Sequence, residues 1–219
     1  MPVRLGIVSD IHCNIQGLEH ALDLETAIDL LDRLGDGHGR DAEELSDAEG
    51  NDAHVPVGGG AAGEDLQAVV VLGNHEETLL GPDGQRALSN PKVDQDLVAW
   101  LRQQPYRTER LIDGKKVVMT HGSPWEPWKD YHYPHEPIWA RAAELDCDTL
   151  IVGHTHYKMA LRVGRVLVIN PGSAGDPRDH RNDFQLSCAT WDTTTGEVVF
   201  YDFPDPTRHF VRHSGEQRA

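Results

Sequence analysis

The sequence predicts an α/β fold in which short buried strands carry polar side chains to one edge of a sheet. Two observations support this prediction. Short apolar runs rich in β-branched residues alternate with amphipathic segments. Four of these runs end directly before, or one glycine before, Asp, Asn or His side chains: residues 3–9, 68–72, 117–120 and 150–152. Ligands of open α/β sheets bind just outside the carboxyl ends of strands, so we expect these side chains to converge.

Length and composition indicate one globular domain. A chain of 219 residues suits a single core, which we expect over residues 1–204, followed by a polar tail at residues 205–219. No apolar run is long enough to span a bilayer, and the first residues lack the pattern of a signal peptide, so we expect a cytoplasmic protein. The three cysteines form no CxxC pair, which argues against a disulfide framework and against a cysteine-based zinc site.

The formal net charge of −16 restricts the partners. Nucleic-acid polymers and anionic membranes would be repelled unless a local field reversed the sign of the charge. A small anionic substrate therefore needs a cationic site within an acidic surface. The charge does not decide whether the chain forms a homo-oligomer.

The first strand is expected over residues 3–9, and a helix should follow it. Asn14 is a suitable N-cap for this helix. Its buried face would be formed by Leu18, Ala21 and Leu22. Residues 28–34 fit either an extension of the helix or a second strand. Their periodicity favours a helix, but we interpret them as a strand because Asp36 then joins the other polar side chains at strand ends.

Residues 37–66 have almost no apolar periodicity. They contain an acidic run over residues 41–52 and the triplet Gly58-Gly59-Gly60. A short helix over residues 41–48 is compatible with the pattern, and we expect the remainder to be a mobile, acidic, glycine-rich insertion. A loop of this length is either functional or disordered.

Periodicity and turn residues predict the later elements. Helices are expected over residues 93–101 and 138–145. The dipeptide Asp113-Gly114 predicts a hairpin that joins two strands, residues 110–112 and 115–120. Further strands are expected over residues 149–152, 158–163, 165–169, 185–191 and 197–203, the last two as a hairpin.

The segment 123–137 is rich in aromatic residues, His and Pro and should form a rigid surface loop. Six of its side chains could line a pocket for an aromatic leaving group or could pack on one another: Trp125, Trp128, Tyr131, His132, Tyr133 and His135. Farther along, Arg178 and Arg181 could bind a phosphate or form salt bridges with neighbouring aspartates.

The strand ends supply seven oxygen and nitrogen ligands and no thiolate: Asp10, His12, Asp36, Asn74, His121, His154 and His156. Such a set suits manganese, iron, cobalt or zinc. Seven ligands are too many for one ion with an open position but suffice for two ions that share a bridging carboxylate. Two ions about 3.5–4 Å apart can acidify a bridging water and stabilise the oxygens of a phosphoryl transfer. Because Asp10 and Asp36 carry only two negative charges, the loaded site would stay cationic.

Each fragment alone is weak evidence, because a single His is more often a capping or surface residue than a ligand. Gly153-His154-Thr155-His156 is more specific, since side chains at i and i+2 leave the same side of an extended segment. Together the fragments resemble the calcineurin-like metallophosphoesterase superfamily. The resemblance depends on five motifs: Asp10-x-His12, Gly35-Asp36, Gly73-Asn74-His75-Glu76, His121-Gly122 and Gly153-His154-x-His156.

The resemblance has consequences for the fold. The turn Asn170-Pro171-Gly172-Ser173 is similar to that of the small bacterial and archaeal phosphodiesterase branch. Membership would imply a four-layer sandwich of two mixed β-sheets flanked by helices. The segment 37–66 departs from the family pattern where relatives carry a tidier helix that shapes the substrate pocket. The sequence therefore leaves the substrate open.

The resemblance also implies a role for each residue of the site. One metal ion would be bound by Asp10, His12 and His156. The other would be bound by Asn74, His121 and His154, with Asp36 bridging the two ions. His75 would orient the phosphate and protonate the leaving oxygen, which suits an imidazole because this group titrates near neutral pH. Manganese is the favoured metal, with iron, cobalt, nickel and zinc as alternatives.

The resulting hypothesis is a phosphoesterase with two divalent metal ions that hydrolyses phosphodiester bonds of a small substrate by attack of a metal-bridging hydroxide. A phosphomonoesterase or protein phosphatase would use the same site and is the first alternative. A non-catalytic metal-binding scaffold is the second. It predicts that the catalytic His or several ligands have been lost, whereas His75 and all seven ligands are present.

Overall fold

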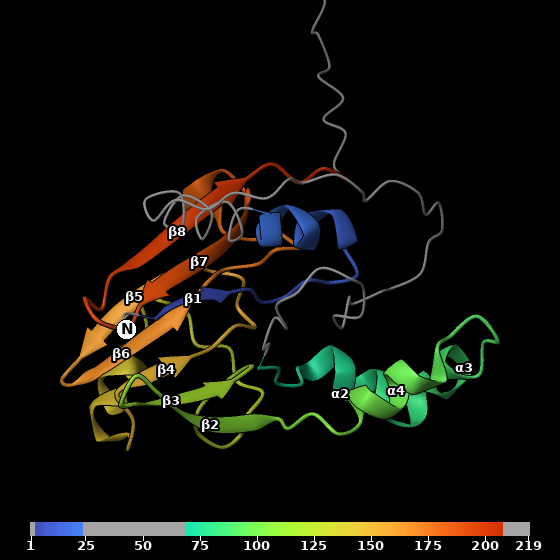
Figure 1. The fold of residues 1–219 in the computed structure, drawn as a ribbon, viewed down its shortest axis with the longest axis horizontal. Helices are drawn as coiled ribbons and strands as arrows, with labels where there is room; N and C mark the ends of the chain where they lie inside the picture. The colour runs from blue at the N-terminus through green and yellow to red at the C-terminus, as the bar shows by residue number, and fades with distance from the viewer. Residues whose placement is uncertain (1–2, 24–68, 208–219) are drawn as a thin grey trace, which may run out of the picture.

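The computed structural model describes residues 3–23 and 69–207. The strand expected over residues 28–34, Asp36 and the segment 37–66 lie outside the described residues. The described chain forms two β-sheets that pack against each other, with helices outside them (Figure 1).

The smaller sheet has three strands in the order β1-β7-β8, and every pair is antiparallel. The strands are β1 (Arg4–Ile7), β7 (Leu186–Asp192) and β8 (Val198–Phe203). The expected hairpin of the last two strands is therefore confirmed.

The larger sheet has five strands in the order β2-β3-β4-β6-β5. The strands are β2 (Arg107–Ile112), β3 (Lys115–Thr120), β4 (Thr149–Ile151), β5 (Met159–Val163) and β6 (Val166–Asn170). β3, β4 and β6 run parallel, whereas β2 and β5 are antiparallel to their neighbours. Every residue of β4 and β6 is buried, as expected for apolar strands covered on both faces.

Alternate residues of the larger sheet pack into two different cores. Val117, Ile151 and Ile169 face the smaller sheet and pack with Ile7 and Trp191. Their sequence neighbours Val118, Leu150 and Val168 face the opposite side and pack on the 3-10 helix η2 (Pro137–Glu144) through Trp139 and Ala142. On the far side of the smaller sheet, Ala21 of the helix over residues 15–23 packs on Leu186, Cys188 and Phe203. The predicted four-layer arrangement is confirmed.

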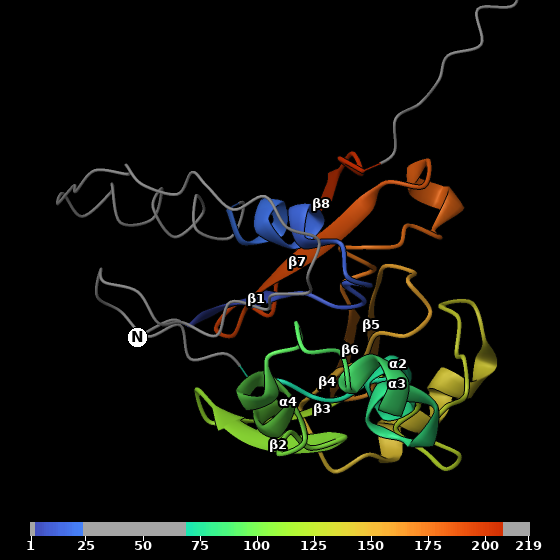
Figure 2. The same cartoon turned by 90° about the vertical axis from the view of Figure 1, so that its right-hand side faces the viewer.

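Four short helical segments extend away from the sheets as an arm in Figure 1, and the arm faces the viewer in Figure 2. They are α2 (Asn74–Leu80), η1 (Pro82–Gly84), α3 (Gln85–Leu88) and α4 (Gln95–Leu101). We predicted only α4, and it is two residues shorter than expected because Asp94 caps it by accepting from the N–H groups of Asp96 and Leu97. Within residues 3–23 and 69–207, no helix has both the length and the apolar character needed to cross a bilayer.

The expectation of a strand over residues 68–72 was wrong for the described part of the run. Residues 69–73 form no strand, and the N–H of Leu72 donates to the carbonyl of Pro105 at 2.9 Å. Leu72 is still buried, whereas Val69 at the other end of the described run is exposed, and no residue of the run pairs with a described strand. α2 begins immediately afterwards, with the side chain of Glu76 accepting from the N–H of Gly73 at 2.8 Å. Asn74 and His75 therefore lie on the first turn of a helix.

Local turn and cap predictions were more accurate. Asn14 caps the first helix, since its Oδ1 accepts from the N–H of Gly17 at 2.9 Å. Asp113 and Gly114 adopt φ values of +48° and +73°, which suits the tight turn of the β2–β3 hairpin. The segment 138–145 is helical as expected but winds as the 3-10 helix η2.

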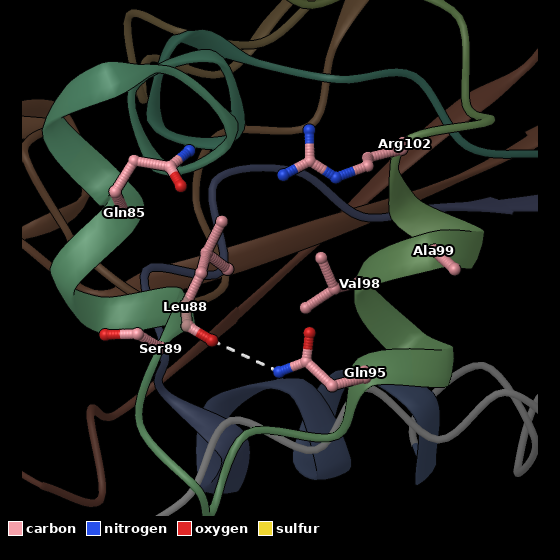
Figure 3. A pocket seen from close by; sticks show the side chains of 7 residues that line it. All are labelled: Gln85, Leu88, Ser89, Gln95, Val98, Ala99 and Arg102. Atoms are coloured by element: carbon pink, nitrogen blue, oxygen red, sulfur yellow. Dashed lines mark hydrogen bonds between the residues drawn. The ribbon is translucent and has the colours of Figure 1, made fainter.

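A groove of about 330 Å³ lies between α3 and α4 (Figure 3). Its walls are formed by Gln85, Leu88, Ser89, Gln95, Val98, Ala99 and Arg102. Gln95 spans it at one end by donating to the carbonyl of Leu88 at 3.1 Å. None of the predicted site residues lines this groove.

Candidate metal centre

Six of the seven predicted ligands lie together, five of them just after the carboxyl ends of strands. Asp10 and His12 follow β1, His121 follows β3, and His154 and His156 follow β4. The sixth, Asn74, opens α2. Since β3 and β4 are parallel, their ends meet at the same edge of the larger sheet. The seventh ligand, Asp36, lies outside the described residues.

The first group consists of Asp10, His12 and His156, whose ligand atoms all lie within 4.8 Å of one another. His156 Nε2 is 3.3 Å from Asp10 Oδ1 and 3.1 Å from His12 Nε2. On the other side of its ring, His156 Nδ1 is 2.6 Å from the carbonyl oxygen of Asp176. Because a carbonyl only accepts, Nδ1 carries the proton and the lone pair of Nε2 faces the group.

The second group consists of Asn74, His121 and His154. Nε2 of His121 lies 3.0 Å from Asn74 Oδ1 and 3.2 Å from His154 Nδ1. His154 Nε2 donates to the carbonyl of Lys129 at 3.2 Å, so the lone pair of the neutral ring is on Nδ1 and faces His121. In both groups a backbone carbonyl selects the ring nitrogen that faces inward, a recurring arrangement around metal-binding His residues.

Asp10 connects the two groups. Its Oδ1 lies 3.3 Å from His156 Nε2 and 3.7 Å from His121 Nε2. Its Oδ2 accepts from Ser9 Oγ at 2.7 Å and from the backbone N–H of His154 at 2.9 Å. The carboxylate is only 1% exposed.

The electrostatics keep the site ready to bind cations. Burial raises the pKa of Asp10, but hydrogen bonds and charge interactions with His156, His121 and Ser9 outweigh it and lower the pKa to about 2. Burial, together with repulsion from His121, lowers the pKa of His154 to about 4. Burial is also the main cause that lowers the pKa of His12 and of His121. At neutral pH the carboxylate is ionised and these imidazoles are neutral, the states required of metal ligands.

The donor atoms present fit a metal ion. With the ring proton on Nδ1, the lone pair of His156 Nε2 and the carboxylate oxygen of Asp10 are both acceptors, and they lie 3.3 Å apart. Such a contact is repulsive unless a second proton on the imidazole or a metal ion lies between the two atoms. Nitrogen and oxygen donors without sulfur suit manganese, iron, cobalt and zinc.

Four of the six described ligand residues have a left-handed backbone. The φ values are +54° for Asp10, +49° for His12, +68° for His154 and +62° for His156. Each such residue other than glycine costs on the order of 1–3 kcal/mol, and such residues cluster at functional sites. The strain is therefore concentrated in the two segments that present Asp10-x-His12 and His154-x-His156.

His75 lies at the rim of the centre. It is exposed, on the first turn of α2, and its ring centroid is 4.5 Å from that of His12 in an edge-to-face arrangement. It does not belong to the group of ligand atoms formed by Asp10, His12 and His156. This position, next to the ligands but outside them, is open to a substrate.

The remaining candidates divide into two kinds. Trp125, His132 and Trp139 pack on one another, which supports self-packing for that part of the loop. Tyr131 is different, because its exposed ring stacks on His154. Arg178 pairs with Asp176 and Arg181 with Asp179, so the salt-bridge interpretation of both arginines is confirmed.

A comparison with models of known protein families identifies the family of this chain. The model of the calcineurin-like phosphoesterase superfamily domain matches residues 3–196. The chain belongs to the calcineurin-like phosphoesterase superfamily. The match spans the larger sheet, β1 and β7 of the smaller sheet, and every strand end that carries a described predicted ligand.

Similar phosphoesterases and related proteins come from archaea and bacteria. A curated but uncharacterised protein of Methanocaldococcus jannaschii is 27% identical over 211 residues, covering 81% of this chain and 79% of that protein. A solved hypothetical protein of Pyrococcus horikoshii has a TM-score of 0.50 at 19% identity and covers 63% of each chain. A solved metallophosphoesterase from Sphaerobacter thermophilus has a TM-score of 0.47 at 25% identity, covering 61% of this chain and 64% of that one. The match thus spans less than two thirds of either solved structure.

The phosphoesterase site depends on supporting residues that sequence reasoning missed. Ser173 Oγ donates to the carbonyl of Asp10 at 2.7 Å. Asn170 Nδ2 donates to the carbonyl of Gly153 at 2.8 Å and lies 3.1 Å from Thr155 Oγ1. Both belong to the Asn-Pro-Gly-Ser turn, which therefore supports the two strained ligand segments. The turn was visible in the sequence, whereas the carbonyl acceptors of Lys129 and Asp176 leave no signal in their side chains.

Proposed function

We propose that this phosphoesterase hydrolyses phosphodiester bonds at a centre of two divalent metal ions. The observation that carries the proposal is the position of Asp10 Oδ1 between two groups of inward-facing donor atoms, 3.3 Å from His156 Nε2 and 3.7 Å from His121 Nε2. One ion cannot use all of these donors and keep an open position for a substrate.

The described residues would hold the ions in two sets. Asp10, His12 and His156 form the first set, and Asn74, His121 and His154 form the second. We assign Asp36 as the bridging carboxylate from the family resemblance. Two ions bound there supply Lewis-acid stabilisation of phosphoryl oxygens and acidify water at neutral pH. Manganese is the proposed metal because the set mixes imidazole with carboxylate and amide oxygen, and iron, cobalt, nickel and zinc are the alternatives.

His75 would act on the substrate. Its exposed ring at the rim, edge-to-face with His12, can reach a phosphoester that lies over the ligands. A protonated imidazole there can donate to a phosphoryl oxygen and pass a proton to the departing alkoxide, which leaves poorly as an anion. Its position outside the first group of ligand atoms supports the role of a general acid.

A diester is the preferred substrate because of charge. A phosphodiester carries one negative charge, whereas the dianion of a phosphomonoester carries two, and a cationic side chain near the site would stabilise the second charge. Arg178, which lies on the segment that supports His156, is already paired with Asp176 at 2.7 Å, and Arg181 is paired with Asp179. Neither guanidinium is therefore available to neutralise the second charge without breaking an ion pair.

The test compares two chromogenic substrates before and after metal removal. The purified protein should hydrolyse bis(p-nitrophenyl) phosphate faster than p-nitrophenyl phosphate, lose activity after exhaustive chelation, and regain it best with manganese. Elemental analysis should find two ions per chain. Full activity with no bound metal would refute the metal centre, whereas a preference for the monoester would favour the phosphomonoesterase alternative. A panel of natural phosphoesters would then identify the substrate class.

A further inference from the structure

The loop over residues 123–136 is built around the buried side chain of Ser123. Ser123 Oγ donates to the carbonyl of Trp125 at 2.7 Å and accepts from the N–H of Trp125 at 3.0 Å. The N–H of Ser123 donates to the carbonyl of Trp128 at 3.0 Å. Nε2 of His132 lies 3.2 Å from Ser123 Oγ, so two separate parts of the loop, at Trp125 and at His132, meet at one hydroxyl.

A second contact holds the C-terminal end of the loop. Nδ1 of His132 lies 3.5 Å from Glu136 Oε2, and the indole N–H of Trp139 donates to the carbonyl of Tyr133 at 3.0 Å. Since Trp139 is buried in the core under the larger sheet, this end of the loop is tied to the scaffold. The residues between Ser123 and His132 thus form a closed, hydrogen-bonded unit.

This unit places two groups on His154. The carbonyl of Lys129 accepts from His154 Nε2 at 3.2 Å, and the ring of Tyr131 stacks on the imidazole with centroids 3.7 Å apart and planes inclined by 27°. The hydrogen bond sets the direction in which Nδ1 points, and the stacked ring opposes rotation about χ2, a torsion that is otherwise broad for His. Tyr131 remains 46% exposed, so the core does not explain its position.

The same loop also reaches the helix that carries Asn74. Lys129 Nζ lies 2.8–2.9 Å from the carboxylate oxygens of Glu77 on α2. The contacts form a ring from Asn74 through His121 and His154 to Lys129 and back to α2 through Glu77. All three members of the second ligand group are thereby connected through the loop.

We propose that the loop over residues 123–136 is a positioning element for the second ligand group, with Tyr131 and the Lys129 carbonyl fixing the orientation of His154. The loop would set the metal affinity of the group formed by Asn74, His121 and His154 without supplying a ligand. The first group would not depend on it, because the imidazole of His156 is held by Asp176 instead. This inference rests on the proposed centre of two metal ions.

The test uses metal binding as its readout, independently of hydrolysis. Metal-free protein is titrated with Co²⁺, and the visible absorption of bound cobalt reports the number of sites, their affinities and their ligand geometry. In Tyr131→Ala, one of the two affinities should fall about 10–100-fold, the usual range for loss of an outer partner of a ligand. The absorption band of that site should change, while the other site keeps the affinity and spectrum of the wild type.

Three further variants separate positioning from general damage. Tyr131→Phe keeps the stacking ring and should bind both ions as the wild type does. Trp128→Ala removes another exposed aromatic side chain of the same loop. Trp128 stacks on none of the described site residues, so this variant should also bind both ions as the wild type does. His132→Ala releases the anchor at Ser123 and should weaken the same site as Tyr131→Ala.

The outcomes are distinguishable. If the wild type binds fewer than two ions, the proposed centre fails. If it binds two and Tyr131→Ala retains both affinities, the positioning role of the loop is refuted. Equal weakening of both sites in Tyr131→Ala and His132→Ala would also refute it, because the loop contacts only the second group. Should Tyr131→Ala fail to fold, His132→Ala and Trp128→Ala test the proposal instead. It is refuted unless His132→Ala weakens one site and Trp128→Ala retains both affinities of the wild type.

Discussion

The backbone N–H of His154 donates to Oδ2 of Asp10 at 2.9 Å, across a sequence separation of 144 residues. This bond joins the segment after β1 in the smaller sheet to the segment after β4 in the larger one. It leaves the other oxygen of Asp10 facing His156 and His121. One buried carboxylate therefore links the two sheets at the site, and it faces both groups of predicted ligands.

Replacing Asp10 should affect both metal positions. Asp10→Asn keeps the shape and the acceptor for the His154 N–H but removes the negative charge that balances the cations. We expect both affinities for Mn²⁺ to fall in a titration followed by elemental analysis. The loss should exceed the factor of about 10–100 that is typical when an outer partner of a ligand is removed. His12→Gln is the matched comparison and should weaken only one position. An equal effect of the two variants would contradict the central position of Asp10.

The assignment of His75 predicts a dependence on the leaving group. His75→Ala should keep both metals and lose about 10²–10⁴-fold in rate with an alkyl or nucleoside leaving group, the usual contribution of a general acid. The loss should be smaller with nitrophenolate, which leaves without much help from a proton. Asp36→Asn is the contrasting variant and should lose metal together with activity. Loss of metal in His75→Ala would make His75 a ligand.

Gly153 should tolerate no side chain. A Cβ built at this position would lie 2.0 Å from Ser9 Oγ and 2.8 Å from Asp10 Oδ2, so Gly153→Ala must displace the side chains of Ser9 and Asp10. We expect a loss of about 1–3 kcal/mol in the free energy of unfolding, as for other overpacked sites, measured by urea denaturation. Combining it with Ser9→Ala should cost less than the sum of the two single changes, because the closest clashing atom is then absent. Strict additivity would argue against the contact.

Asp179 should give a pH-dependent contribution to stability. Burial raises its pKa, but hydrogen bonds from the side chain and backbone of Arg181 and from the backbone of Lys158 outweigh burial and lower it below the ordinary value. A carboxyl group with a depressed pKa in the folded state stabilises the protein above its unfolded pKa, and this contribution is lost as the pH falls through the folded pKa. Asp179→Asn should therefore destabilise the protein by about 1–3 kcal/mol at pH 7 and by less below about pH 4.

Urea denaturation at pH 7 and at pH 3 measures that difference. Asp146→Asn is the matched control, because Asp146 also pairs with basic side chains but is highly exposed, and exposed pairs contribute little. Its unfolding transition should stay close to that of the wild type at both pH values. A destabilisation by Asp179→Asn that does not change with pH would show that the charge of Asp179 is not the cause.

The sequence by itself determined the features that are local. The order of donor residues after apolar runs, the Asn14 cap and the Asp113-Gly114 turn are each encoded within a few neighbouring residues. The structure shows the cap and the turn in place and brings the described donors together. Local patterns failed for residues 69–72, because β-branched apolar residues suit a buried strand but cannot supply a pairing partner. They also missed α2, which places Asn74 and His75 on a helix turn.

Only the tertiary structure decided how the donors are oriented. The carbonyls of Lys129 and Asp176 select the nitrogens that His154 and His156 turn inward, and every residue has such a carbonyl, so the side-chain sequence does not mark them. The same holds for the stacking of Tyr131 and for the left-handed backbone of the ligand residues, which long-range packing imposes against local preference. Ligand identity is a property of side chains, whereas ligand geometry depends on contacts between segments far apart in the chain.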